Sequence, residues 1–175
     1  MRPYRDDLLE EQLIMANEHI ATYLNDHLSG SVVAVELMEN LEAVYAGTEI
    51  ASFIAELRGE VEADVEQLKS IMSQLEISQS RTRKASAWLT EKLTQIKLRL
   101  DDPTQGNLRL FESLEALSLG IEGKKSLWLA LAAAAELTPG LQIADYERLK
   151  KRAEDQRSRV EAKRLEAAKA ALKLE

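Results

Sequence analysis

Residues 50–75 read IASFIAELRGEVEADVEQLKSIMSQL, and this stretch decides the fold. Apolar residues recur in it every three or four positions, the period of one face of an α-helix that packs against neighbours. Asp64 falls on this apolar stripe, where another apolar residue is due, and Glu60 flanks it one turn away. The stretch therefore predicts an amphipathic helix with a carboxylate facing the core. The stripe consists of Ile50, Ile54, Leu57, Val61, Leu68, Ile71 and Leu75.

The same periodicity predicts helices along the rest of the chain. Gly47 suits a helix C-terminus, Thr48 an N-cap, and Asn107 the N-cap of the fourth helix, after the loop DDPTQGN at 101–107. Because short connections make neighbouring helices antiparallel, the predicted class is all-α, an up-down-up-down four-helix bundle over residues 1–140. A long charged helix follows over residues 141–175. The expected helices span about 9–45, 49–77, 83–100, 107–137 and 142 to the C-terminus.

Composition narrows the class of protein. The 175 residues are 45% hydrophobic and 30% charged, which is typical of a soluble globular protein. The absence of cysteine excludes disulfides and thiolate metal sites. The longest unbroken apolar run, 127–135, is too short to span a membrane, and the start MRPYRDDLLEEQ carries no apolar signal region. We therefore expect a cytoplasmic protein.

Charge is unevenly distributed, with −10 over residues 1–140 and +3 over residues 141–175. The acidic body argues against nucleic acid or a membrane surface as partner. In the basic tail, three glutamates spaced seven residues apart each precede a basic residue by three positions, which supports an exposed helix. We expect this helix to dock on the bundle or on a second subunit of a homodimer; the alternative is an arm that recruits an acidic protein. The pairs are Glu147 with Lys150, Glu154 with Arg157, and Glu161 with Arg164.

Polar residues interrupt the buried faces of all four bundle helices. In the first helix His27 and Ser31 lie in the middle of the apolar stripe, whereas Asn25 faces away from it. Counting outward from the loops puts one ionisable group of each helix near one level at mid-bundle. We call this set the predicted polar layer: His27, Ser31, Glu60, Asp64, Lys92, Glu115 and Glu122.

Two stretches, YLNDHLSGS at 23–31 and LSLGIEGKKSLW at 117–128, resemble a bacterial four-helix-bundle branch of the ferritin-like superfamily. The resemblance covers residues 9–137 and implies a ferritin-like bundle with a role associated with stress. The di-iron motif of that family places Glu on two helices and Glu-x-x-His on the other two. This chain contains no Glu-x-x-His, and both of its histidines, His19 and His27, lie in the first helix.

Three interpretations of the predicted polar layer stay open. In the first, Lys92 and His27 neutralise the carboxylates, the layer is structural without a cofactor, and the protein is a non-enzymatic accessory or interaction protein. In the second, a divergent oxidoreductase binds iron, manganese or zinc. In the third, the layer surrounds a small-molecule pocket, with Gly30, Gly120 and Gly123 giving room for a ligand or allowing close helix approach. The metal ligands of the second interpretation are His27, Glu60, Asp64 and Glu115.

Overall fold

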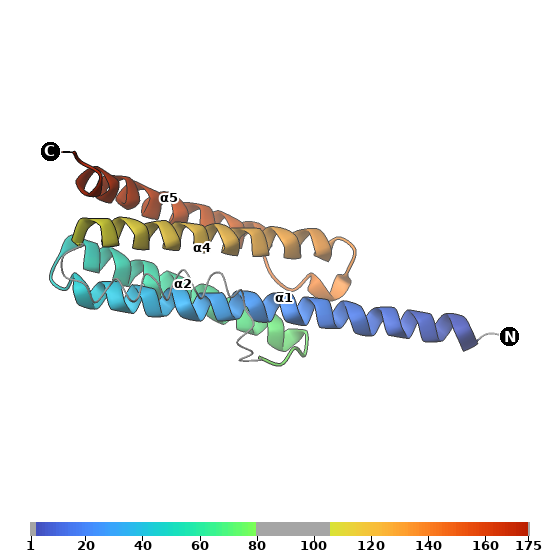
Figure 1. The fold of residues 1–175 in the computed structure, drawn as a ribbon. Helices are drawn as coiled ribbons and strands as arrows, with labels where there is room; N and C mark the ends of the chain where they lie inside the picture. Colours follow the sequence, from blue (N-terminus) through green and yellow to red (C-terminus); the bar gives the residue numbers. More distant parts are fainter. Residues whose placement is uncertain (1–2, 80–105, 175) are drawn as a thin grey trace.

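The computed structural model describes residues 3–79 and 106–174, with side chains from Asn17 onward. All regular structure within these ranges is helical, which confirms the all-α class (Figure 1). The predicted helix over 83–100, which contains Lys92, and most of the loop at 101–107 lie outside the described residues. The elements are α1 (Pro3–Val44), α2 (Glu49–Gln74), α4 (Gly106–Ala135), the 3-10 turn η2 (Pro139–Leu141) and α5 (Tyr146–Ala171).

Local sequence signals set several helix ends. Gly47 adopts φ +80° between α1 and α2, a conformation that favours glycine, and the Thr48 side chain accepts a hydrogen bond from the Ala51 amide, 3.4 Å away. Both predictions for this turn are confirmed. Asn107 lies inside α4 rather than capping it, because the helix already includes Gly106. The start of α5 is capped by Asp145, which accepts from the Arg148 amide at 3.0 Å.

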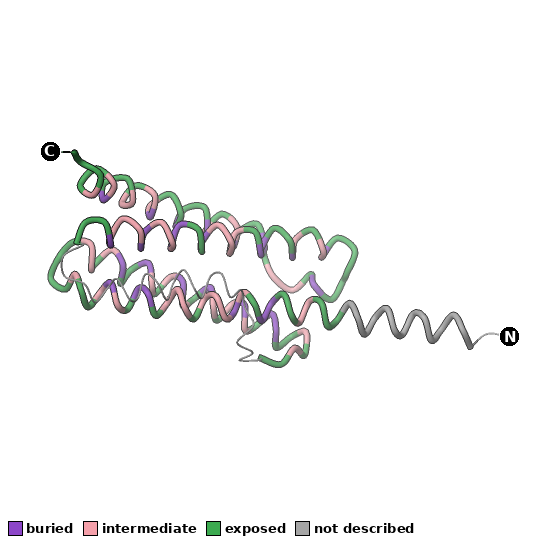
Figure 2. Tube along the Cα trace, in the orientation of Figure 1, coloured by how far each residue is buried: buried purple, intermediate pink, exposed green. Residues whose placement is uncertain are grey.

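The helices lie side by side, with α1 antiparallel to α2 and α4 antiparallel to α5, while α2 and α4 run in the same direction (Figure 1). Buried positions recur along α2, α4 and α5 (Figure 2). None of the described helices is both long and apolar enough to cross a membrane. All four helices supply one hydrophobic core, whose fully buried members include Leu24, Met38, Ile54, Leu57, Leu114, Leu149, Ala153 and Val160.

The C-terminal helix docks within its own chain. Leu149, Ala153 and Val160 of α5 are each 0% exposed. Leu165 and Leu172, further along the chain, are 49% and 60% exposed, so the apolar contact of α5 is concentrated nearer its N-terminal half. The division of the chain into units 1–140 and 141–175 stays a prediction.

Glycines in helix interiors offer a test of the packing. Gly59 in α2, and Gly120 and Gly123 in α4, lie where an added Cβ atom would meet no atom of residues 3–79 or 106–174 within 4 Å. Among the described helices these positions therefore do not serve close helix approach, one of the two roles considered for Gly120 and Gly123.

We predict that Gly59→Ala and Gly120→Ala each raise the free energy of unfolding by about 0.5–1 kcal/mol, because alanine restricts the unfolded chain and meets open space in the fold. Gly47→Ala is the control of opposite sign, since its φ of +80° is strained for any L side chain. Urea unfolding measures all three variants. If Gly120→Ala instead lowers the free energy of unfolding, the space around Gly120 is not open, and the packing described here is wrong at that position.

Candidate functional site

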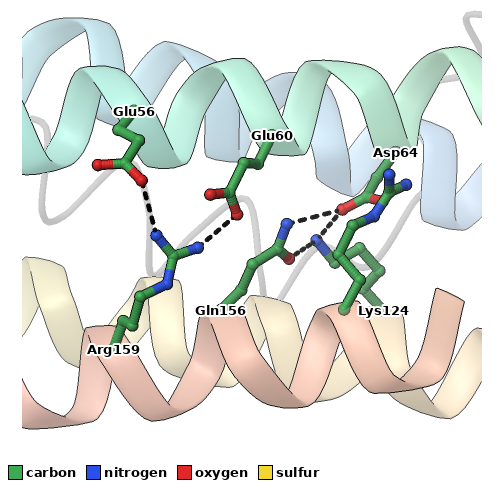
Figure 3. Close-up of polar contacts among 7 residues, drawn as sticks. Glu56, Glu60, Asp64, Lys124, Gln156 and Arg159 are labelled. Carbon is green, nitrogen blue, oxygen red and sulfur yellow. Dashed lines mark hydrogen bonds and ion pairs between the residues drawn. The ribbon is translucent and has the colours of Figure 1, made fainter. Parts of the chain in front are cut away.

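Asp64 is a buried carboxylate, 2% exposed, that joins three helices. It accepts hydrogen bonds from Lys124 Nζ of α4 at 2.5 Å and from Gln156 Nε2 of α5 at 3.2 Å (Figure 3). Lys124 Nζ also donates to Gln156 Oε1 at 2.5 Å, which closes the network, and Arg152 of α5 forms an ion pair with Asp64. We call these four residues the Asp64 layer.

Three members of this network, Asp64, Lys124 and Gln156, occupy seam positions of their helices, the positions that face the neighbouring helices. Buried positions alternate by three and four residues, the spacing of helices that pack side by side. Asp64 lies between Val61 and Leu68 in this pattern, Lys124 between Ile121 and Trp128, and Gln156 between Ala153 and Val160. The polar side chains therefore replace apolar residues at one level of the core.

A row of arginines on α5 pairs with the acidic face of α2. Arg159 contacts Glu60 at 2.5 Å and Glu56 at 3.2 Å (Figure 3). Arg152 and Arg159 are seven residues apart along α5, and their partners Asp64 and Glu56 are eight apart in the opposite direction along α2. The pairs therefore follow the register of two antiparallel helices.

The same register holds between α5 and α4. Arg157 pairs with Glu122 at 3.2 Å, and Arg164 pairs with Glu115 at 3.3 Å. Both the arginines and the glutamates are seven residues apart, in opposite directions along their helices. Arg157 thus contacts α4 rather than Glu154, the partner that the tail pattern predicted. The other two predicted pairs, Glu147 with Lys150 and Glu161 with Arg164, are both present at 2.5 Å.

Burial and pairing shift the ionisation of these groups. Burial lowers the pKa of Lys124 below its ordinary value, and the charge of Asp64 opposes this shift. Burial alone would raise the pKa of Glu60, but hydrogen bonds from Arg159 and Gln156 outweigh it and lower that pKa. Burial also lowers the pKa of His27, against the opposing charge of Asp26, so its imidazole is neutral at pH 7.

His27 and Ser31 of α1 line a cavity of about 360 Å³ that also borders Asp64 and Lys124. Ser31 donates to the Leu28 carbonyl at 2.6 Å. His27 makes no ion pair with Asp64; within the described residues, its ring contact is an edge-to-face one with Tyr23. The structure therefore brings His27, Ser31 and Asp64 to one cavity, as helical projection predicted, but supplies the cations of the carboxylate from α4 and α5.

Other members of the predicted polar layer lie elsewhere. Glu115 is nine residues before Lys124 on α4, which at 1.5 Å per residue is about 13 Å along the helix axis. Glu122 pairs with Lys125 at 2.8 Å and with Arg157 of α5, away from Asp64. Asn25, expected to face away from the bundle, is 7% exposed, and its side chain donates to the Ser78 carbonyl at 3.2 Å. That expectation was wrong because the chain following α2 covers this side of α1.

Arg152, Gln156 and Lys124 complete the layer but were not among the predicted site residues. A signal for them was present in the sequence. Lys124 and Gln156 interrupt the three-four spacing of buried residues in their helices, as Asp64 does in α2. Arg152 lies at the edge of the α5 seam, its side chain 30% exposed, and its sequence position resembles that of the other tail arginines.

The carboxylates proposed as metal ligands each have a cationic partner: Arg159 for Glu60, Lys124 and Arg152 for Asp64, and Arg164 for Glu115. Across residues 3–79 and 106–174, no three His, Asp or Glu side chains gather as metal ligands would. The metal site stays a prediction.

Comparisons of the chain with protein-family models, with curated proteins and with solved structures found no match. The class of protein is therefore defined by the fold itself: an all-helical bundle with a buried ion-pair layer.

Asp64→Ala should lower the free energy of unfolding by about 3–5 kcal/mol, because Lys124 and Gln156 then stay buried without their acceptor. Replacing both charges, in Asp64→Leu with Lys124→Met, should cost much less, since no uncompensated ion remains in the core. Glu66→Ala on the same helix removes an exposed pair with Lys69 and should cost at most about 1 kcal/mol. Urea unfolding of the set measures these effects. Additive losses in the double variant would show that Asp64 and Lys124 are not coupled.

Proposed function

We propose that this protein is a non-enzymatic, ferritin-like helical bundle that acts as an accessory protein by binding other protein chains, first of all a second copy of itself. The observation that carries the proposal is the internal neutralisation of the Asp64 layer. The two stretches that resemble the ferritin-like superfamily, together with the helical bundle, support the family and add the association with stress. The polar layer then has a structural role.

The pairing of Asp64 with cationic side chains favours a structural role for the layer over a catalytic or metal-binding role. A general acid, a general base or a metal ligand needs a polar group with capacity left for a substrate or an ion. Asp64 instead accepts from Lys124 and Gln156 and pairs with Arg152, so its two oxygens are already occupied. Because its members come from three helices, the same network also favours one position of α5 along the axes of α2 and α4. A buried polar layer of this kind can specify the register of packed helices.

The surface of α4 supports a protein partner. Residues 126–135 at its C-terminal end carry no charged side chain, and several of them stay exposed. Leu129 is 43% exposed, and Leu137, two residues after the end of α4, is 89% exposed. Exposed apolar residues that gather on one element are typical of protein contacts. We therefore propose this side of α4 as the homodimer surface.

Light scattering tests the dimer. The chain has a mass of 19.6 kDa, and the full-length protein should scatter as twice that mass. Ala130→Glu places a charge in the middle of the exposed side of α4 and should shift the mass towards the monomer, because a buried unpaired charge opposes association. Ala63→Glu on α2, also an exposed alanine, is the matched control and should stay dimeric. A wild-type protein that is monomeric at every concentration would exclude this surface as a self-association site.

Elemental analysis tests the absence of a cofactor. Protein purified from cells supplied with iron, manganese and zinc should contain each metal far below one per chain. Asp64→Asn is the companion variant, because it keeps the shape of the side chain and removes the charge that a metal would need. Stoichiometric metal in the wild type, lost in Asp64→Asn, would favour the alternative of a metal-dependent oxidoreductase.

A further inference from the structure

The cavity beside the Asp64 layer is large enough for a small molecule. It lies between α1, α2 and α4, measures about 360 Å³, and its described walls are mostly apolar. Small-molecule sites in proteins have volumes of roughly 300–1,000 Å³ and combine apolar walls with a few polar groups. Its polar side chains come from three helices, and Trp128, 1% exposed, forms part of the apolar wall.

The charged groups on the wall are already compensated. Asp64 and Lys124 bind each other at 2.5 Å; Asp64 also pairs with Arg152 of α5, and Lys124 also donates to Gln156 of α5. A charged ligand would therefore be taken out of water with no unpaired charge of opposite sign to meet it, which is unfavourable. Among the charged residues of the described wall, Asp26 alone lies outside this network, and it is exposed to solvent. The wall accordingly favours an uncharged ligand.

His27 is a polar group on the cavity wall that is left for a ligand, and the buried indole N–H of Trp128 is another. Its imidazole borders the cavity, and within the described residues no hydrogen bond joins either ring nitrogen to another group. A neutral imidazole carries one N–H donor and one acceptor nitrogen. A ligand with a single donor or acceptor could satisfy one of them where the surroundings are apolar, and a hydrogen bond in such surroundings is worth more than in water.

The glycines keep this space open. Gly30, Gly120 and Gly123 all border the cavity, and a Cβ atom on either glycine of α4 would meet no atom of the described residues within 4 Å. A glycine inside a helix lowers helix stability relative to alanine. Contacts with the described residues give no reason for glycine at these two positions, whereas a molecule bound in the cavity would.

We propose that the cavity between α1, α2 and α4 binds a small, uncharged, mainly apolar molecule with one hydrogen-bonding group, which contacts His27. This is a binding site beyond the structural role of the Asp64 layer. It is independent of the dimer surface on α4, so either proposal can fail without the other.

The test uses N-phenyl-1-naphthylamine, a neutral aromatic probe with one N–H group. It is titrated into full-length Trp88→Phe protein, in which Trp128 is the remaining tryptophan. Saturable one-to-one binding, seen both in probe emission and in quenching of Trp128, is the expected result. His27→Phe, which keeps an aromatic ring and removes the hydrogen bond, should weaken binding about fivefold. The anionic analogue 8-anilinonaphthalene-1-sulfonate should bind at least about tenfold more weakly than the neutral probe.

A matched pair of glycine variants locates the site. Gly120→Leu fills the cavity from α4 and should weaken probe binding by about tenfold or more, whereas Gly59→Leu, at an open position on α2 outside the cavity, should leave it unchanged. Far-ultraviolet circular dichroism checks that both variants keep the helical content of the wild type. Absence of saturable binding by the wild type, equal effects of the two leucine variants, or stronger binding of the anionic probe would each overturn the proposal.

Discussion

One buried carboxylate constrains the arrangement of three helices. Moving Asp64 from water into the core costs several kcal/mol, and the cost is offset only while Lys124, Arg152 and Gln156 stay within bonding distance. These partners come from α4 and α5. A slide of any one helix by a single turn, about 5.4 Å, would separate donors from acceptor. The C-terminal helix is therefore part of the core of the bundle, and its register on α2 and α4 follows from this contact.

Apolar contacts and ion pairs contribute differently to the packing of α5 on the other helices. Leu149, Ala153 and Val160 remove apolar surface from water without specifying the height at which the helix sits, because the hydrophobic effect has no direction. The ion pairs of Arg157 and Arg164 with α4 are partly exposed, and such pairs contribute about 0–1 kcal/mol each. Their spacing nevertheless matches a single register. The apolar seam thus supplies most of the stability of the contact, and the charges select one alignment among several.

The polar layer has two sides with different properties. Towards α5, Asp64 and Lys124 form a closed network with Gln156. Towards α1, the same two residues border a cavity in which His27 keeps a neutral imidazole. Because Asp64 and Lys124 neutralise each other, their part of the cavity wall carries no net charge. A structural role for the layer and a binding role for the cavity are therefore compatible. The pairing of charges that stabilises the layer also leaves the cavity suited to an uncharged ligand.

For the described residues, the sequence by itself determined which segments are helical and, with Asn25 as an exception, which face of each is buried, because both depend on spacing within one helix. The turn at Gly47 and Thr48 and the burial of Asp64 follow from such local rules. Only the tertiary structure decided which residues neutralise Asp64. Lys124 and Gln156 lie 60 and 92 residues away in the chain, and Glu115, placed near Asp64 by counting from the loops, lies about two and a half turns from Lys124. Counting along helices accumulates error with every connection, and the charge pattern of the tail fits a solvated helix as well as a docked one. The contacts between helices depend on how their faces pack, which no pattern within a single helix specifies.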